Sequence, residues 1–230
     1  MEKNYTFNDL LEIVEKLRGE NGCPWDREQT HDSIKHNIIE EGYELIEALV
    51  ENDFPKMADE SGDLLLQVIF HAQIGKEHEE YTIDDVINAV SRKLVHRHPH
   101  VFGDVSVKNS EEVLANWNQI KRDDRGQKTV ADDMRGVSAF LPALMRAEKI
   151  QSKAGKNGYV FNEPAVSAES VYNMISILAD NNDKEVAEKY IGKILFELVS
   201  VAKKLDVDAE TALSRHTELF INEFAKHEND

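Results

Sequence analysis

The segment "EEGYELIEALVENDFPKMADESGD", residues 40–63, has nine Asp or Glu residues among its 24 positions and one basic residue, Lys56. The acidic residues form a Glu-Glu-x-x-Glu pattern at 40–44 and a Glu-x-x-Asp pattern at 60–63. Residues three or four positions apart share one face of an α-helix. Between the two patterns, "ENDFP" predicts a turn, and Pro55 suits the first turn of the next helix. The segment therefore predicts an antiparallel helical hairpin on which two acidic faces meet.

Helical periodicity extends over the rest of the chain. Apolar residues recur at steps of three and four, and five prolines and eleven glycines in 230 residues leave long uninterrupted windows. The sequence shows no strand-like alternation of useful length. We therefore expect an all-α protein with helices near residues 6–18, 30–51, 54–77, 83–97, 110–122, 138–154, 165–180, 184–204 and 208–226.

The composition narrows the classes of function. Hydrophobic residues make up 41% of the chain and charged residues 31%, and the formal net charge is -17. Such an acidic protein is poorly suited to nucleic acid, because phosphates are bound by clustered Lys and Arg. The apolar runs are far shorter than the roughly 20 residues of a membrane helix. The acidic charge and the short apolar runs therefore predict no nucleic-acid or membrane partner. The single cysteine, Cys23, and a polar N-terminus unlike a signal peptide predict a cytoplasmic protein.

Carboxylates that face one another across a hairpin repel, so they either take up protons at higher pH or bind cations. A donor set of oxygen atoms without His or Cys favours Mg²⁺, with Mn²⁺ as the second choice, over Zn²⁺. For a single Glu-x-x-Glu pattern, the simpler interpretation is a solvated charged face. Here two acidic patterns occupy consecutive helices that also carry apolar stripes. We therefore predict a metal site made by Glu40, Glu41, Glu44, Glu60 and Asp63.

Basic residues near this pattern indicate the chemistry of the ligand. Lys56 precedes Glu60 by one helical turn, and Lys93 and Arg97 are four positions apart on a predicted helix. A metal cluster edged by Lys and Arg suits a polyphosphate, whose oxygens are shared between the cations and the basic side chains. The alternative for Lys93 and Arg97 is an ordinary surface pair.

The two halves of the chain resemble each other. "SGDLLLQVIFHAQI" at 61–74 aligns with "IGKILFELVSVAKK" at 191–204, and "SRKLVHRHPH" at 91–100 aligns more weakly with "HTELFINEF" at 216–224. A polar stretch at 121–138 lacks helical periodicity and predicts a linker. We expect a duplicated helical module with a first domain at 1–122, a linker at 123–137 and a second domain at 138–230.

The second half has lost the candidate ligands while keeping the apolar positions. In the gapped alignment, Glu40, Glu41 and Glu44 fall opposite Asn173, Met174 and Ile177, Glu60 and Asp63 opposite Tyr190 and Lys193, Lys56 opposite Val186, and Lys93 and Arg97 opposite Leu219 and Glu223. We predict that the first half binds metal and catalyses. The second half packs, dimerises or supports the first.

With these motifs, the sequence resembles the MazG family of nucleoside triphosphate pyrophosphohydrolases. The resemblance covers nearly the whole chain. The acidic pattern is the signature of the wider all-α pyrophosphatase superfamily. More specific are "GCPWDREQTHDSI" at 22–34, "GDLLLQVIFHAQI" at 62–74 and "RHPHVFGD" at 97–104. The resemblance implies hydrolysis of an NTP or dNTP to the monophosphate and pyrophosphate with Mg²⁺. It also implies a homodimer or higher homo-oligomer in which helices of two protomers complete each bundle. Family members with two modules often keep the acidic motif in the second one, whereas this chain does not.

Carried over by position, the resemblance assigns metal binding to the five acidic residues and phosphate binding to Lys56, Lys93 and Arg97. Either Glu41 or Glu44 would orient or deprotonate the attacking water, and the sequence does not choose between them. Trp25 is the candidate to stack on the base or border it, and a core tryptophan that anchors its loop is an equal alternative.

Two other classes of protein compete with this hypothesis. A ferritin-like di-iron protein would need Glu-x-x-His, but Asp63 stands where the histidine would be. A nucleotide-sensing or partner-binding protein on the same fold is the non-enzymatic alternative, and the loss of the second site favours it. The residues do not determine the base, the sugar or the physiological substrate. The histidines at 96, 98 and 100 surround Pro99, which predicts a structural turn rather than a zinc site.

Overall fold

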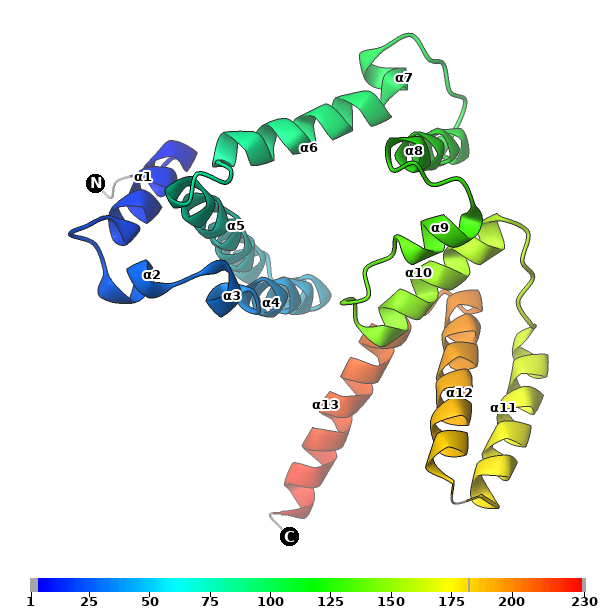
Figure 1. Cartoon of the computed structure of the whole chain (residues 1–230). Coiled ribbons are helices and arrows are strands. Elements are labelled where there is room, and N and C mark those ends of the chain that lie inside the picture. Colours follow the sequence, from blue (N-terminus) through cyan, green and yellow to red (C-terminus); the bar gives the residue numbers. More distant parts are fainter. Residues whose placement is uncertain (1–3, 182, 229–230) are drawn as a thin grey trace. The chain divides into compact units, whose positions relative to one another are not determined.

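The computed structural model describes residues 4–181 and 183–228, and the regular elements of these residues are all helices (Figure 1). The predicted all-α class is confirmed. The chain divides into two compact units between Val113 and Leu114. Residues 1–3, 182 and 229–230 of the predicted domains lie outside the described residues.

The helices of the first unit are α1 (Phe7–Arg18), α2 (Pro24–Glu28), α3 (His31–Ile34), α4 (Asn37–Glu51), α5 (Phe54–Glu77), α6 (Ile83–Arg97) and α7 (Pro99–Phe102). Helix α8 (Ser110–Asp124) crosses the division between the units. The second unit continues with α9 (Val130–Arg135), α10 (Ala143–Lys156), α11 (Pro164–Ala179), α12 (Lys184–Lys204) and α13 (Ala209–His227).

Helices α4 and α5 form the predicted hairpin, and its turn follows from local chemistry. Asn52 ends α4 in the left-handed conformation, with φ of 57°, which Asn tolerates better than most residues. Asp53 caps α5 by accepting a hydrogen bond from the Lys56 backbone N–H over 3.1 Å. Pro55 lies in the first turn of α5, where its missing N–H costs no helical hydrogen bond. The chain therefore reverses within two residues, and α4 packs along α5.

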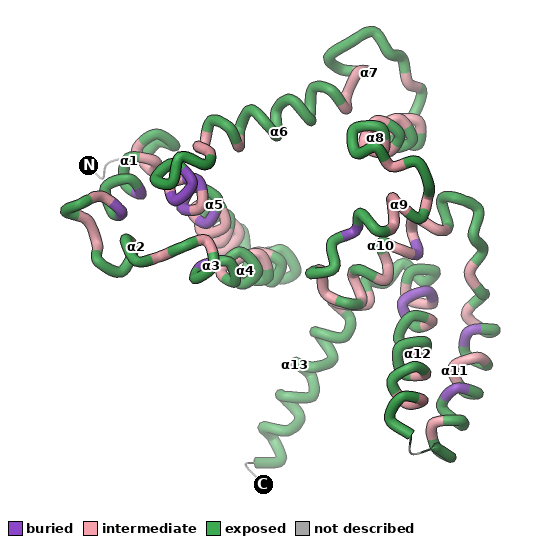
Figure 2. Tube along the Cα trace, viewed as in Figure 1, coloured by how far each residue is buried: buried purple, intermediate pink, exposed green. Residues whose placement is uncertain are grey.

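Helix α5 is the centre of the first unit. It packs against α1, α3, α4 and α6, and Figure 2 shows buried residues gathered along it. Each fully buried aliphatic or aromatic side chain contributes about 1.5–3 kcal/mol to folding. The core cluster joins three helices and consists of Val14 from α1, Ile34 from α3, and Ile69, Phe70 and Ile74 from α5. This core fixes the face that α5 turns toward α4.

Helix α12 is the centre of the second unit, as α5 is of the first. It packs against α10, α11 and α13, as α5 packs against α1, α4 and α6. Helices α11 and α12 form a hairpin with the chain order of α4 and α5. The residues at the centre are partly polar: Gln151, Ser167, Met174, Val199 and Ser200 are buried. The matching order of contacts supports the predicted duplication.

The structure differs from the predicted helices in five places. The helix expected at 30–51 is broken at Lys35 and His36 into α3 and α4, although both residues keep right-handed helical dihedral angles. Residues 24–28 and 99–102 form short helices, each with a proline in its first turn. Helix α9 lies inside the predicted linker, because Thr129 and Asp132 form a capping box. Helix α10 begins only after Pro142, since the residue before a proline avoids helical geometry.

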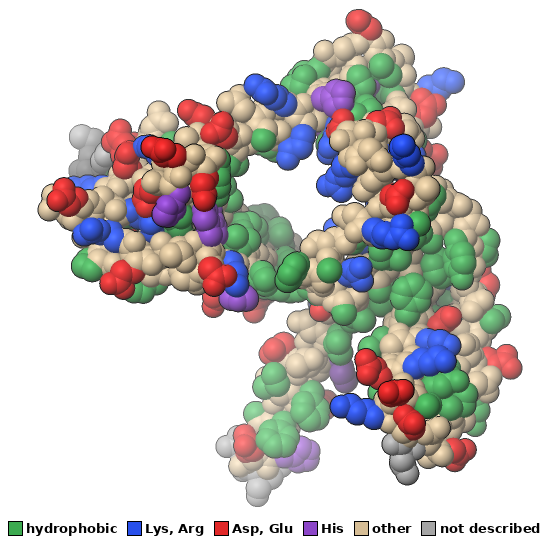
Figure 3. All heavy atoms as spheres, in the orientation of Figure 1, with side chains coloured by type: hydrophobic (Ala, Val, Ile, Leu, Met, Phe, Trp, Pro, Cys, Tyr) green, Lys and Arg blue, Asp and Glu red, His purple; other side chains and the backbone are tan. Residues whose placement is uncertain are grey.

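Many large apolar side chains are exposed in both units. They include Ile39, Tyr43, Ile46 and Leu49 of α4, and Leu219, Phe220, Ile221 and Phe224 of α13. Figure 3 shows hydrophobic side chains at the surface along α13. Patches of this kind commonly mark surfaces that meet another protein. Within the described residues, no helix combines the length and the apolar character that crossing a membrane would require.

Candidate metal centre

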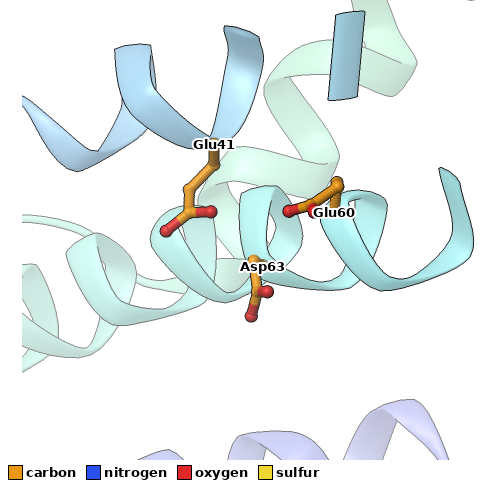
Figure 4. A group of neighbouring side chains, drawn as sticks. All are labelled: Glu41, Glu60 and Asp63. Carbon is orange, nitrogen blue, oxygen red and sulfur yellow. The ribbon is translucent and has the colours of Figure 1, made fainter. Parts of the chain in front are cut away.

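Three carboxylates meet across the α4–α5 hairpin. Glu41 comes from α4, and Glu60 and Asp63 come from successive turns of α5. One oxygen of each side chain lies within 4.8 Å of the others (Figure 4). The spacing of the residues produces this arrangement, because positions 60 and 63 share the face of α5 that packs on α4. In the described part of the chain, this is the group of carboxylate, imidazole or thiol side chains with a geometry suited to a metal ion.

The electrostatics of Glu41 reflect a crowded acidic site. Glu41 is half-buried, and burial raises its pKa above the ordinary value of 4.5. The charges of Asp63, Glu44 and Glu40 raise this pKa further. Gln67, one turn beyond Asp63 on α5, opposes these effects by donating an amide hydrogen bond to Glu41 Oε1 over 3.5 Å. A bound cation would relieve the repulsion among these carboxylates.

Glu44 and Glu40 lie at the edge of the cluster. The pKa of Glu60 is raised first by burial, then by the charge of Glu44 and by a side-chain hydrogen bond with it. Glu44 therefore lies next to Glu60, whereas Glu40 acts on Glu41 through its charge. Of the five predicted ligands, the structure brings Glu41, Glu60 and Asp63 together and places Glu44 beside them.

The donor set fits a hard divalent cation. It offers carboxylate oxygens without sulfur or imidazole, which is the chemistry that Mg²⁺ and Mn²⁺ prefer. Burial, and then the charges of neighbouring acids, raise the pKa of both Glu41 and Glu60. Both observations favour a cation at this point of the hairpin.

The predicted phosphate ligands are not gathered at the cluster. The Lys56 ammonium lies 2.6 Å from Glu47 Oε2 and 3.6 Å from Glu51 Oε2, so it is bound to α4. Lys93 and Arg97 lie on α6, which starts beyond the C-terminal end of α5 and runs away from the hairpin (Figure 1). Their roles as phosphate ligands remain predictions.

Trp25 lies on α2 with 62% of its surface exposed, so it is not the core residue that was the alternative. A buried arginine holds its loop: Arg18 donates hydrogen bonds to the backbone oxygens of Asp26 and Gln29 and to the Glu77 carboxylate. Sequence reasoning missed Arg18, because its partner Glu77 is 59 residues away. The exposed indole is free to meet a ligand, but the described residues place no other proposed site residue beside it.

The second unit has a different arrangement at the positions aligned with the carboxylates. Met174, opposite Glu41 in the internal alignment, is buried. Lys193, opposite Asp63, places its ammonium 5.4 Å from the ring centroid of Tyr190, which is opposite Glu60. A cation–π contact thus stands where the first unit has two acids.

Fold and site together define an all-α protein in which a helical hairpin presents a cluster of carboxylates with a geometry suited to a metal ion. Residues 29–102 match the family model described as the MazG nucleotide pyrophosphohydrolase domain. The chain is 40% identical over 227 residues to the nucleoside triphosphate pyrophosphohydrolase/pyrophosphatase MazG of Thermotoga maritima, covering 99% of this chain and 87% of that protein. It is also 40% identical over 225 residues to the nucleoside triphosphate pyrophosphohydrolase of Escherichia coli K12, covering 95% of this chain and 86% of that protein.

The chain therefore belongs to the MazG family of nucleotide pyrophosphohydrolases. A mazG-related protein of Thermotoga maritima with a known crystal structure is 28% identical, matches 50% of this chain and 98% of its own, and superposes with a TM-score of 0.43.

Proposed function

We propose that the first unit hydrolyses nucleoside or deoxynucleoside triphosphates to the monophosphate and pyrophosphate. The observation that carries the proposal is the convergence of Glu41, Glu60 and Asp63 within 4.8 Å in a chain of this family. Glu44 and Glu40 complete the predicted acidic set. Mg²⁺ is the proposed cofactor, with Mn²⁺ as a substitute, because the donors are all carboxylate oxygens.

The reaction breaks the bond between the α-phosphorus and the oxygen that bridges to the β-phosphorus. Water adds to the α-phosphorus, pyrophosphate leaves, and the water proton passes to a nearby carboxylate, for which Glu41 and Glu44 are the candidates. When bound, the cation would make its water more acidic and neutralise phosphate oxygens. Lys56, Lys93 and Arg97 are the proposed phosphate ligands, and Trp25 is the proposed contact of the base.

We further propose that the second unit is inactive and serves assembly, and that the protein forms a homodimer or higher homo-oligomer. The replacement of Glu41, Glu60 and Asp63 by Met174, Tyr190 and Lys193 supports the first point. The exposed apolar side chains of α4 and α13 support the second, because a second copy would remove them from water. The lone cysteine supports a cytoplasmic location.

The test is pyrophosphate release from a panel of NTPs and dNTPs with Mg²⁺, in wild type, Glu41→Gln and Asp63→Asn. Each substitution keeps the shape of the side chain and removes its charge, so we expect activity to fall by about 10²-fold or more. Glu12→Gln, an exposed acid on α1, is the matched control and should stay within about twofold of wild type.

The same experiment separates the nucleotide-sensing alternative. A wild-type protein that binds nucleotides but releases no pyrophosphate across the panel would favour the sensor. Full activity in both variants would show that the carboxylates of the hairpin are not the site.

A further inference from the structure

A pair of histidines joins α3 to α5, with His71 two turns beyond Asp63 on α5. His31 Nδ1 lies 2.7 Å from His71 Nδ1, the ring centroids are 5.0 Å apart, and the ring planes differ by 4°. Atoms of two rings stacked face to face stay at least about 3.5 Å apart, which is the contact distance of carbon atoms. The rings therefore lie edge to edge in nearly one plane, with the two Nδ1 atoms pointing at each other.

This geometry limits the number of protons that the two imidazoles can bind while they stay in contact. A hydrogen bond between the two nitrogens needs one Nδ1–H donor and one bare Nδ1 acceptor. Two neutral imidazoles satisfy it, and so does a pair that carries one additional proton. A second additional proton would place two N–H groups head to head at 2.7 Å, and the contact would break. The contact between α3 and α5 therefore depends on at least one of the two imidazoles remaining neutral.

The surroundings hold the half-buried pair in place and shield the two Nε2 atoms from solvent. Both Nε2 atoms are buried and have no hydrogen-bond partner, although Glu80 Oε2 lies 3.5 Å from His31 Nε2. The Tyr81 hydroxyl donates to the His71 carbonyl over 3.2 Å, and its ring packs against Gly75, where an added Cβ would lie 2.8 Å from Tyr81 Cδ1. Burial, and then the charge of His31, lower the pKa of His71 below its ordinary value of 6.5.

Two acids close to this stretch of α5 have hydrogen-bond partners of their own. Glu77 is bound by Arg18 of α1, and Glu41 of α4 accepts from Gln67, one turn before His71. Glu80, whose Oε2 lies 3.5 Å from His31 Nε2, can accompany a single imidazolium of the pair. The single negative charge of Glu80 cannot balance two imidazolium groups.

The pair is connected to the cluster through the backbone. Helix α3 passes directly into α4, and the His36 carbonyl accepts hydrogen bonds from the N–H groups of Ile39 at 2.9 Å and Glu40 at 3.1 Å. A displacement of α3 from α5 would therefore be transmitted to the first turns of α4, which carry Glu40 and Glu41. Ile34, buried in the core, limits the displacement to a local one.

We propose that His31 and His71 are positioning residues that share a proton and act as an acid-sensitive latch, holding α3 and the start of α4 in register with α5. Uptake of a second proton opens the latch and moves Glu41 away from Glu60 and Asp63. The consequence for hydrolysis rests on the proposed function. The latch itself does not, because it can be observed without substrate.

The test uses the full chain without metal or nucleotide. Nitrogen-15 NMR of the histidines at pH 7.5 should show one protonated and one bare Nδ1 within the pair. Amide hydrogen exchange of residues 31–41, corrected for the intrinsic effect of pH, should become about tenfold faster at pH 5.5 than at pH 7.5. His71→Asn supplies an amide oxygen near the position of Nδ1 and takes up no proton, so its acceleration should stay below about threefold. His78→Asn, at an exposed position at the end of α5, is the matched control and should behave like wild type.

The latch is rejected if both Nδ1 atoms are bare at pH 7.5, or if wild type and His71→Asn accelerate equally. A pH profile of kcat/KM then separates the two proposals: its acid limb should lie at lower pH in His71→Asn than in wild type. Expected exchange behaviour without any hydrolysis would support the latch and overturn the proposed function. Hydrolysis whose acid limb does not differ between the two proteins would overturn the link between the latch and the site.

Discussion

The Lys56 ammonium lies 2.6 Å from Glu47 Oε2, so the lysine nearest to the carboxylate cluster in sequence is bound to an acid outside it. Lys56 precedes Glu60 by one turn of α5, whereas Glu47 follows Glu44 by three residues on α4. The hydrogen bond with Glu47 is the largest of the causes that raise the pKa of Lys56, so the lysine keeps its proton. Glu47 therefore competes with any phosphate for the same ammonium.

Removal of this competitor is expected to strengthen nucleotide binding. In Glu47→Gln, the ammonium loses its charged partner and turns more readily to a phosphate, so KM should fall by about two- to fivefold while kcat changes little. Steady-state kinetics with Mg²⁺ measures both. Lys56→Met should raise KM by about tenfold. An unchanged KM in both variants would assign Lys56 to closing the hairpin and not to binding phosphate.

The acidic cluster should also determine how stability depends on pH. The pKa values of Glu41 and Glu60 are raised above 4.5 in the folded protein, so the folded state holds protons that the unfolded state has released. The stabilising effect of this protonation is fully present below pH 4.5 and is lost as the pH rises through the folded pKa values. The metal-free wild type should therefore lose stability relative to Glu41→Gln as the pH rises toward 7.

Differences in Tm between these two proteins, measured at a series of pH values, isolate this effect from the titration of His71. The histidine acts in the opposite direction, because its lowered pKa costs stability as the pH falls below 6.5. Added Mn²⁺ should raise the Tm of wild type at pH 7 and leave that of Glu41→Gln nearly unchanged. Equal Mn²⁺ shifts in both proteins would place the cation elsewhere.

A partly buried ion pair, in which Arg18 is the buried member, links α1 to the end of α5. Arg18 Nη2 lies 2.6 Å from Glu77 Oε2, and 4% of the Arg18 side chain is exposed. Arg18→Ala leaves Glu77 without its partner and two carbonyl oxygens without their donor, so the free energy of unfolding should fall by about 3 kcal/mol. Urea denaturation measures the change.

The matched control for this pair is Lys76→Ala. Lys76 lies 2.8 Å from Glu15 and also joins α5 to α1, but both side chains are more than half exposed. Its loss should cost about 0.5 kcal/mol, as is usual for an exposed pair. Similar losses in the two variants would show that burial does not strengthen the contact of Arg18.

Much of the hairpin could be predicted from the sequence because its determinants are local. Asn52, Asp53 and Pro55 set the reversal within four positions, and the helices expected at 54–77, 83–97 and 184–204 have the observed bounds. The grouping of Glu41 with Glu60 and Asp63 follows from helical spacing once the hairpin is known.

What the sequence did not predict depends on pairs far apart in the chain. His31 and His71 are 40 residues apart, and Arg18 and Glu77 are 59 residues apart. Helical periodicity assigns each of these residues to a helix face but does not say which side chain meets it. The ion pair of Lys56 was not predicted for another reason: its position on α5 could be predicted, but a long side chain has several acids within reach, and it is paired with Glu47. Its role as a phosphate ligand stays a prediction.

The proposal that the first unit catalyses and the second unit supports it can be tested at two aligned positions, Met174 and Glu41. Met174 is buried against the neighbours of α11, so Met174→Ala should destabilise the protein by about 2–5 kcal/mol. If the second unit only supports the first, kcat should stay within about twofold of wild type at a temperature where circular dichroism shows both variants folded. Glu41→Gln should show the reverse, with no loss of stability and a loss of activity of about 10²-fold or more. A folded Met174→Ala protein without activity would show that the second unit takes part in catalysis.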